Sequence, residues 1–300
     1  MFGPYLTYEG RSTRRTNATK KTWVLLITCL ASRATHVEVV TTMDTAAFKL
    51  ALRRFLAIRG TCVSIRSDQG SNFLGALNQS VDLNKVKGMV LDQGITWKLN
   101  PPQASNFGGV WERKVGAIKS VLNATMKLLG PRQLSREEFT TLLLEATSIV
   151  NNTPLWCVSG SPDDPCPLSP ANLLTLKDNP NPPSLDSFDQ LDLLQYGTRR
   201  WRRVLYLSEQ FWSRWRQNYI AELQERKKWR SANSKIGVGD VVLLRGKAKR
   251  NDWPGGRIIE VTPSEDGVVR RIKLQMGSRD GRPPLVLERS VRDVVVLVPN

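Results

Sequence analysis

The stretches TWVLLITCL at residues 22–30 and THVEVVTT at residues 35–42 decide the fold. Both are rich in β-branched and aromatic residues, which favour strands, and the segment ASRA at residues 31–34 has the length of a tight turn. The first stretch is apolar throughout, as a strand buried on both faces would be. These residues therefore predict an antiparallel pair that includes a central strand of a sheet.

Downstream of this pair, helical and strand patterns alternate. Asp44 stands where a helix cap is expected, and apolar residues at helical spacing follow it as far as Gly60. Short strands are predicted before Asp68 and at residues 95–102. Long helices are predicted from residues 107–109 to Gly130 and from Ser135 onward, the second beginning with a capping box between Ser135 and Glu138. This order predicts a mixed α/β fold.

The second half of the sequence has a different character. Residues 160–192 are rich in Pro, Asp, Asn and Ser and show little periodicity, which indicates a linker or crossing loop. Residues 199–230 predict one long basic helix. From residue 236 onward, short strands alternate with turns, a pattern typical of a small five-stranded barrel. We therefore predict three parts: a core at 1–160, a linker at 161–198, and a basic Trp-rich helix with a barrel at 199–300.

The charge of the chain points to a polyanionic partner. The formal net charge is +17, and residues 199–250 contain fifteen Lys and Arg against four Asp and Glu. Cations neutralise phosphates, and indoles stack on bases, so this composition favours a nucleic acid as the partner. Trp212, Trp215 and Trp229 are instead expected in the apolar core of an amphipathic helix.

Other function classes are excluded by simple patterns. The sequence contains no apolar run of eighteen residues and no basic-then-apolar leader, so a membrane or secreted protein is not expected. A single histidine, and four cysteines without CxxC spacing, exclude a His/Cys zinc finger. We expect a nuclear or cytoplasmic protein.

Asp68 and Glu112 are the two acidic residues with a candidate chemical role. In IRSDQGSNF at 65–73, Asp68 is either a metal ligand at the end of a strand or the first residue of a turn. Glu112 lies in the first turns of a predicted helix, where the helix dipole alone favours an acid. Lys119, seven residues on, shares its helical face. An acid that holds a metal beside cations that hold phosphate is the combination that phosphoryl transfer requires.

Two long signatures resemble a known family. SDQGSNF at 67–73 followed by NPPQASNFGGVWERKVGAIK at 100–119 resembles the integrase core of long-terminal-repeat retrotransposons, specifically the Pao (BEL) group. MFGP, TCLASRATHVEVV and FLAIRG resemble the same core. FWSRWRQNYIAELQERKKW, VGDVVLL and WPGGRIIEV resemble the domain that follows it in those polyproteins. The resemblance covers nearly the whole chain in order, apart from residues 160–195.

The resemblance implies an RNase H-like core that performs DNA integration by polynucleotidyl transfer. Asp68 and Glu112 would be the second and third carboxylates of an Asp, Asp, Glu triad that binds two Mg²⁺ or Mn²⁺ ions. Lys119 falls where the family presents a lysine to the DNA end, and Asn72 would orient the loop of Asp68. Arg113 and Lys114 would also contact nucleic acid. The implied partners are retroelement DNA ends, target DNA and further copies of the chain.

The sequence also departs from the family pattern. The first Asp of the triad stands two residues before the Phe of its signature, a position upstream of Met1 when Phe2 is that residue. We therefore expect a form that is truncated at its N-terminus and impaired in catalysis. Glu9, Glu38 and Asp44 are the nearby alternatives. Glu38 belongs to the family's HVE pattern and Asp44 is expected to cap a helix, so neither of these two is a persuasive substitute. In the second signature, Asn106 stands where the family usually has His.

Two functions remain open. The first is an integrase with an incomplete triad that still binds nucleic acid. The second is a non-catalytic fragment that binds nucleic acid or chromatin through the basic helix of residues 199–250 and the barrel, with Arg199, Arg200, Arg202 and Arg203 as candidate contacts.

Overall fold

The structure is a computed structural model that describes most of the chain in separate ranges. The described residues are 1–9, 19–67, 86, 88, 90–100, 108–157, 167–176, 188–195, 199–223, 236–265, 267–276 and 284–299. The chain divides into an N-terminal unit (Met1–Thr147 with Phe188–Phe211) and a C-terminal unit (Ser148–Ser187 with Trp212–Asn300). This division differs from the boundaries predicted at residues 160 and 199, because the start of the basic helix packs within the N-terminal unit.

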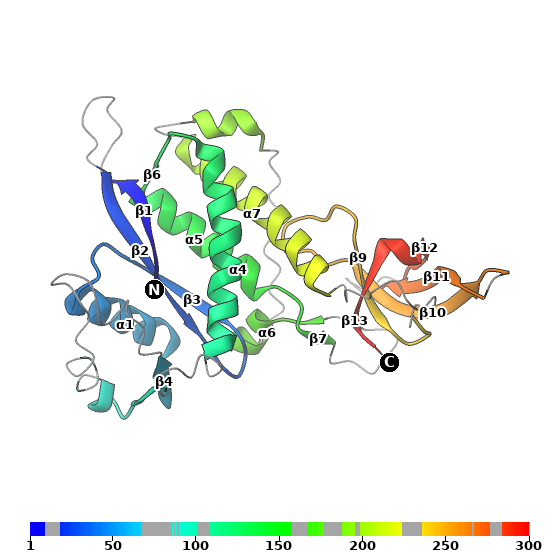
Figure 1. The fold of residues 1–300 in the computed structure, drawn as a ribbon, viewed down its shortest axis with the longest axis horizontal. Coiled ribbons are helices and arrows are strands. Elements are labelled where there is room, and N and C mark those ends of the chain that lie inside the picture. Colours follow the sequence, from blue (N-terminus) through cyan, green and yellow to red (C-terminus); the bar gives the residue numbers. More distant parts are fainter. Residues whose placement is uncertain are drawn as a thin grey trace. The chain divides into compact units, whose positions relative to one another are not determined.

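The N-terminal unit is built around a mixed four-stranded sheet (Figure 1). β1 (Phe2–Tyr8), β2 (Thr19–Thr28) and β3 (Thr35–Val40) are antiparallel, and the two-residue strand β6 (Leu134–Ser135) is parallel to β1. The order is β3-β2-β1-β6, so β2 is an internal strand. Val24 and Leu25 are consecutive and point to opposite faces, yet both are buried. The predicted central strand is confirmed.

Helix α1 (Thr45–Arg59) packs on this sheet, where Phe48, Leu52 and Leu56 share an apolar cluster with Leu25 of β2. Its ends are where the sequence predicts them. The Asp44 carboxylate accepts a hydrogen bond from the Ala47 backbone N–H at 2.7 Å, and the chain turns at Gly60 with φ of 79°. Such a positive φ favours glycine, which explains the stop signal.

Two more helices complete the main body of this unit. α4 (Gly109–Met126) continues into a 3-10 turn, η2 (Lys127–Leu129), that ends at Gly130. α5 (Arg136–Asn151) follows β6. Tyr5 of β1 contacts both helices: its hydroxyl donates to Asn123 of α4 at 2.8 Å, and its ring lies 5.0 Å from that of Phe139 of α5. The sheet therefore fixes where α4 and α5 lie.

A second, two-stranded sheet consists of β4 (Ser64–Ser67) and β5 (Thr96–Leu99), which are parallel. In the described residues this pair forms a ladder of its own, separate from the four-stranded sheet. The predicted class is confirmed at the level of a mixed-sheet α/β core followed by a helix and a small antiparallel sheet. The RNase H-like assignment, and the closure of the second sheet into a barrel, stay predictions.

Glu138 joins three elements of the N-terminal unit. One of its carboxylate oxygens accepts the Ser135 backbone N–H at 2.7 Å, while the Ser135 hydroxyl accepts the Glu138 N–H at 3.2 Å, so the predicted capping box is confirmed. The other oxygen accepts from Arg203 of α7 (Arg200–Leu223) at 2.6 Å. The Arg203 and Glu138 side chains are 0% and 3% exposed, so this ion pair is fully buried.

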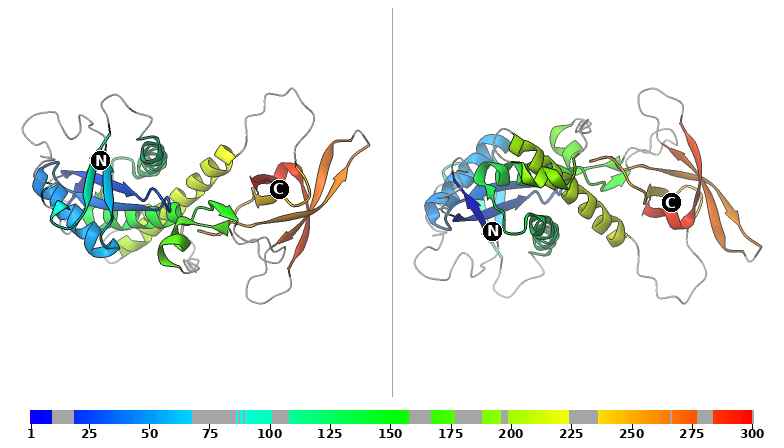
Figure 2. Two further views of the ribbon diagram at one scale, coloured as in Figure 1. Left: turned by 90° about the horizontal axis from the view of Figure 1, so that it is seen from below. Right: turned by 90° about the horizontal axis from the view of Figure 1, so that it is seen from above.

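The C-terminal unit contains a five-stranded antiparallel sheet in the order β12-β11-β10-β9-β13. Its strands are β9 (Val241–Leu244), β10 (Gly255–Pro263), β11 (Val269–Met276), β12 (Val286–Ser290) and β13 (Val294–Val298). Figure 2 shows β10 and β11 as a long twisted pair. A 3-10 turn, η5 (Val291–Asp293), connects β12 to β13, and the apolar core includes Val242, Ile258 and Ile272. The five predicted strands are confirmed.

The C-terminal half of α7 is anchored by buried aromatic and basic side chains. The Trp212 and Tyr219 rings contact Trp253 edge-on, with centroids 5.0 and 5.3 Å away. Arg216 is buried and donates to the backbone carbonyls of residues 244–246 at 2.5–3.1 Å. The prediction that Trp212 and Trp215 are core residues is confirmed by their burial, whereas Trp229 lies outside the described residues.

Shorter elements lie between these parts: β7 (Trp156–Cys157), β8 (Pro167–Leu168), α6 (Pro170–Thr175) and η3 (Gln190–Leu194). Across the described ranges, we find no helix with the length and apolarity needed to span a membrane.

Replacing Arg203 with Ala should destabilise the fold by about 3–5 kcal/mol, because it leaves the Glu138 carboxylate buried and unpaired. Arg200→Ala is the matched control. Arg200 lies on the same helix and pairs with Glu137, the neighbour of Glu138, but both side chains are exposed, so its loss should cost less than about 1 kcal/mol. Urea unfolding followed by circular dichroism measures both values, and equal effects would contradict the proposed importance of the buried pair.

Candidate active site and nucleic-acid-binding residues

Helix α4 presents Glu112 to solvent in its first turn. Gly108 caps this helix, and the Glu112 carboxylate packs directly over it: a Cβ added at Gly108 would lie 2.3 Å from Oε1 of Glu112. A side chain at position 108 would require the flexible Glu112 carboxylate to move from this place. Gly108 therefore has two roles: it is the N-cap of α4, and its lack of a side chain accommodates the Glu112 carboxylate.

The cations predicted beside Glu112 lie on the same helix. Arg113 and Lys119 are exposed, and Lys114 is half-buried. The Arg113 guanidinium donates to the Gly109 carbonyl at 3.1 Å, which holds it near the helix start. Because α4 is continuous from Gly109 to Met126, Lys119 lies two turns beyond Glu112 on the same face, while Ile118 and Leu122 face the core.

Asp68 and Asn72 lie outside the described residues, so whether Asp68 meets Glu112 stays a prediction. The structure describes the strand that leads to Asp68. β4 ends at Ser67, whose backbone carbonyl accepts the Asn100 N–H at 2.9 Å and whose hydroxyl accepts the Trp97 indole N–H at 3.0 Å. The predicted short strand before Asp68 is thus confirmed.

The three acids considered as alternatives for the first carboxylate each have another task. Asp44 caps α1. Glu38 is buried between His36, at 2.9 Å, and Arg54, at 2.5 Å. Burial alone would raise the pKa of Glu38, but hydrogen bonds from His36 and Arg54 outweigh it and lower that pKa. Glu9 pairs with Lys20 and Arg136.

In the part of the chain that the structure describes, no three His, Cys, Asp or Glu side chains form a group able to hold a metal ion.

The four arginines predicted to bind nucleic acid have different environments. Arg199 is exposed, and Arg200 is partly exposed and pairs with Glu137 at 2.7 Å. Arg202 is less exposed and pairs with Asp192 at 2.7 Å. The prediction is wrong for Arg203, which is completely buried against Glu138 and has no surface to offer a phosphate. In the structure it lies on the inner face of α7 with the buried Val204 and Leu207.

Sequence reasoning did not single out Trp201 as an exposed aromatic. Its residue surface is 46% exposed, and its ring makes an edge contact with Phe188 at 6.3 Å. The Arg202 guanidinium lies 5.6 Å from the indole centroid, a cation–π contact. Helical spacing alone would group Trp201 with the buried Ser208, so no signal in the sequence indicated its exposure.

Comparisons with known proteins found the following. The family described as "Family of unknown function (DUF5641)" matches residues 199–297. A comparison with curated proteins gave no match. Similar solved structures include the integrase catalytic core domain of HTLV-2 in complex with magnesium, at 16% identity and a TM-score of 0.34, covering 57% of this chain and 93% of that one. An intasome of simian T-cell lymphotropic virus is similar at 9% identity and a TM-score of 0.38, covering 99% of this chain and 78% of that one.

Gly108→Ala should displace the Glu112 carboxylate, because the new methyl group would occupy its place. Gly109→Ala is the matched control, since a Cβ there meets no atom within 4 Å. The Glu112 carboxyl carbon resonance, followed by ¹³C NMR, should shift in the first variant and stay near its original value in the second. Identical spectra for both variants would show that Gly108 does not position the acid.

Proposed function

We propose that this chain is an integrase-like protein of the Pao (BEL) retrotransposon type, which binds DNA and carries the carboxylates of a polynucleotidyl transferase site. The observation that carries the proposal is the placement of Glu112. An exposed acid in the first turn of α4, packed over Gly108, lies on the helix face that also presents Lys119. The signature SDQGSNF, which begins where β4 ends, supplies Asp68 as its partner.

The donor chemistry fits a divalent metal ion. Asp68 and Glu112 offer carboxylate oxygens, which Mg²⁺ and Mn²⁺ prefer, and these two side chains would hold the metal. When bound, such ions activate the attacking oxygen and stabilise the leaving one. The exposed cations of α4 would bind and orient phosphates of the DNA end, with Lys119 furthest along the helix. Asn72 would orient the loop that carries Asp68. The partners are retroelement and target DNA, and further copies of the chain.

DNA joining with Mn²⁺ tests the catalytic half of this proposal. The resemblance puts the first acid directly before Met1, so the assay uses residues 1–300 preceded by an added aspartate. We expect this protein to join labelled DNA ends, and Asp68→Asn or Glu112→Gln to lower the rate by at least about 100-fold. Glu265→Gln, an exposed acid in the turn after β10, is the control and should leave the rate unchanged. Joining that survives both substitutions would refute the assigned carboxylates.

A specific observation also favours the second function, nucleic-acid binding without catalysis. Trp201 is an exposed indole beside two exposed or partly exposed arginines, Arg199 and Arg200. Aromatic side chains next to cations are typical of surfaces that bind nucleic-acid strands, because bases stack on the ring while cations neutralise the backbone. If the joining assay shows tight DNA binding and no joining by the extended protein, this second function is the correct one.

Reversing both charges, Arg199→Glu with Arg200→Glu, should weaken DNA binding at least about tenfold and lower the slope of log affinity against log salt by about 2. Arg53→Glu with Arg59→Glu is the control, because these exposed arginines of α1 give the same change in net charge. Fluorescence anisotropy with a labelled DNA measures the affinities. Equal losses in the two double variants would mean that net charge alone, and not the start of α7, governs binding. Arg203 is left out because its reversal would unfold the chain.

A further inference from the structure

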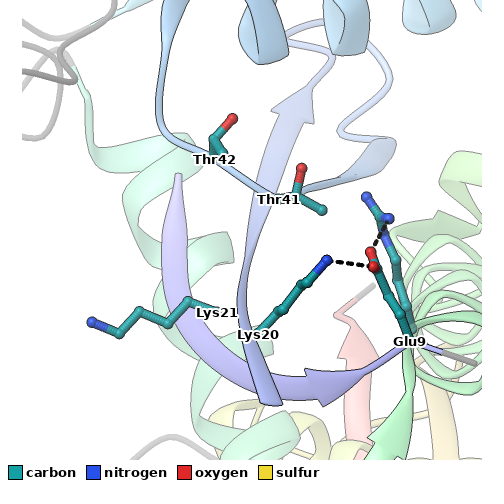
Figure 3. A pocket seen from close by; sticks show the side chains of 6 residues that line it. Glu9, Lys20, Lys21, Thr41 and Thr42 are labelled. Carbon is teal, nitrogen blue, oxygen red and sulfur yellow. Dashed lines mark hydrogen bonds and ion pairs between the residues drawn. The ribbon is translucent and has the colours of Figure 1, made fainter. Parts of the chain in front are cut away.

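A pocket rich in cations lies at one end of the four-stranded sheet (Figure 3), and none of the α4 residues described above lines it. It is lined by Glu9, Lys20, Lys21, Thr41, Thr42 and Arg136. These residues come from the end of β1, the start of β2, the segment after β3 and the first residue of α5. Three cations and one carboxylate line it, so its net charge is positive.

Strand register brings two of these cations to Glu9. β1 pairs with β2 so that Tyr8 lies opposite Thr19, and it pairs with β6 so that Tyr8 lies beside Ser135. Because β6 is parallel to β1, Arg136 is the next residue beside Glu9. Because β2 is antiparallel, Lys20 lies opposite Thr7, two residues before Glu9, and its long side chain reaches diagonally to the Glu9 carboxylate. A cation from each strand next to β1, or from the residue that follows it, therefore pairs with the Glu9 carboxylate. The strand pairing of the sheet positions Glu9, Lys20 and Arg136 together.

The Glu9 carboxylate holds one cation on each oxygen. Lys20 donates to Oε2 at 2.6 Å and Arg136 donates to Oε1 at 2.8 Å, and Figure 3 shows Lys20 extended toward Glu9 while Lys21 points away. The hydrogen bond from Lys20, together with the charges of Lys20 and Arg136, lowers the pKa of Glu9. All three side chains are about half exposed, so these ion pairs contribute little to stability and open readily.

The carboxylate occupies the position that a phosphate group would take between these cations. A phosphate offers the same pair of acceptor oxygens to a guanidinium and an ammonium group, with stronger charge. Arg136 is also the first residue of α5, whose N-terminus favours an anion. Thr41 and Thr42 add hydroxyl groups to the wall of the pocket.

We propose that this pocket binds a phosphate of a nucleic-acid backbone, and that Glu9 is a resident anion which the phosphate displaces from Lys20 and Arg136. The site would contact DNA at a second place, apart from Glu112 and Lys119. The proposal rests on the proposed function only in that the chain binds DNA. It does not require metal or catalysis.

The test is DNA binding in EDTA, using the full chain and a labelled duplex over a range of salt concentrations. Glu9→Gln removes the competing anion and should tighten binding by about threefold or more, while Lys20→Ala should weaken it and lower the salt slope by about 1. The matched controls are Glu260→Gln and Lys273→Ala. Glu260 and Lys273 form a similar exposed pair at 2.8 Å on the C-terminal sheet, and their loss changes the net charge equally.

Different failures identify different errors. If Glu9→Gln binds DNA no more tightly than Glu260→Gln, the pocket is not a phosphate site, even though DNA binding by the chain stands. If the unchanged chain binds no DNA, both this site and the proposed function are refuted. If inorganic phosphate at low millimolar concentration removes the difference between Lys20→Ala and the unchanged chain while a chloride control of equal ionic strength does not, phosphate competes with the nucleic-acid backbone for this pocket, which supports the site.

Discussion

The buried ion pair between Glu138 and Arg203 is the interaction on which the arrangement of the N-terminal unit depends. Glu138 accepts from the Ser135 backbone with one oxygen and from Arg203 with the other. It thereby fixes the start of α5 next to β6, and through β6 next to β1, while it holds α7 against the same point. A buried carboxylate without its arginine would be costly, so this part of the fold requires all of these elements together. Residues next to Glu138 in the sequence form ion pairs at the surface: Arg136 pairs with Glu9, and Glu137 pairs with Arg200.

This use of arginine changes how the charge of the chain should be interpreted. The sequence has a large positive excess in residues 199–250, which suggests one uniform binding surface. In the structure, Arg203 and Arg216 are buried and bind protein groups, so they stabilise the fold and are unavailable to a polyanion. Exposed cations occur on several elements of the described residues: among them, Arg199 and Arg200 lie at the start of α7, Lys119 on α4, and Lys20 with Arg136 at the end of the sheet. If the chain binds DNA as proposed, this distribution predicts contact at several places.

Local signals in the sequence predicted the elements well, and long-range contacts account for the errors. The helix caps and helix ends depend on contacts within a few residues, so their positions could be inferred from spacing alone. They are Asp44, Gly60, Gly130 and the capping box of Ser135 and Glu138. The partner of Arg203 is 65 residues away, and nothing near Arg203 in the sequence distinguishes it from Arg200. The cluster at Glu9 arises from the register of β1 with two strands, a property of the sheet and not of any segment. For the candidate site, the helix that carries Glu112 could be predicted from the sequence, and the role of Glu112 stays a prediction, whereas the packing of its carboxylate over Gly108 could be found only from the structure.

In the proposed function, Asp68 and Glu112 hold the same metal ion. The most direct measurement adds Mn²⁺ in small amounts to the chain labelled with ¹³C at its carboxyl groups, because this paramagnetic ion broadens the resonances of groups close to it. We expect the carboxyl resonances of Asp68 and Glu112 to broaden together at the lowest concentrations, before that of the exposed control Glu265. Broadening of Glu112 without Asp68, or of all exposed carboxylates alike, would contradict a shared site.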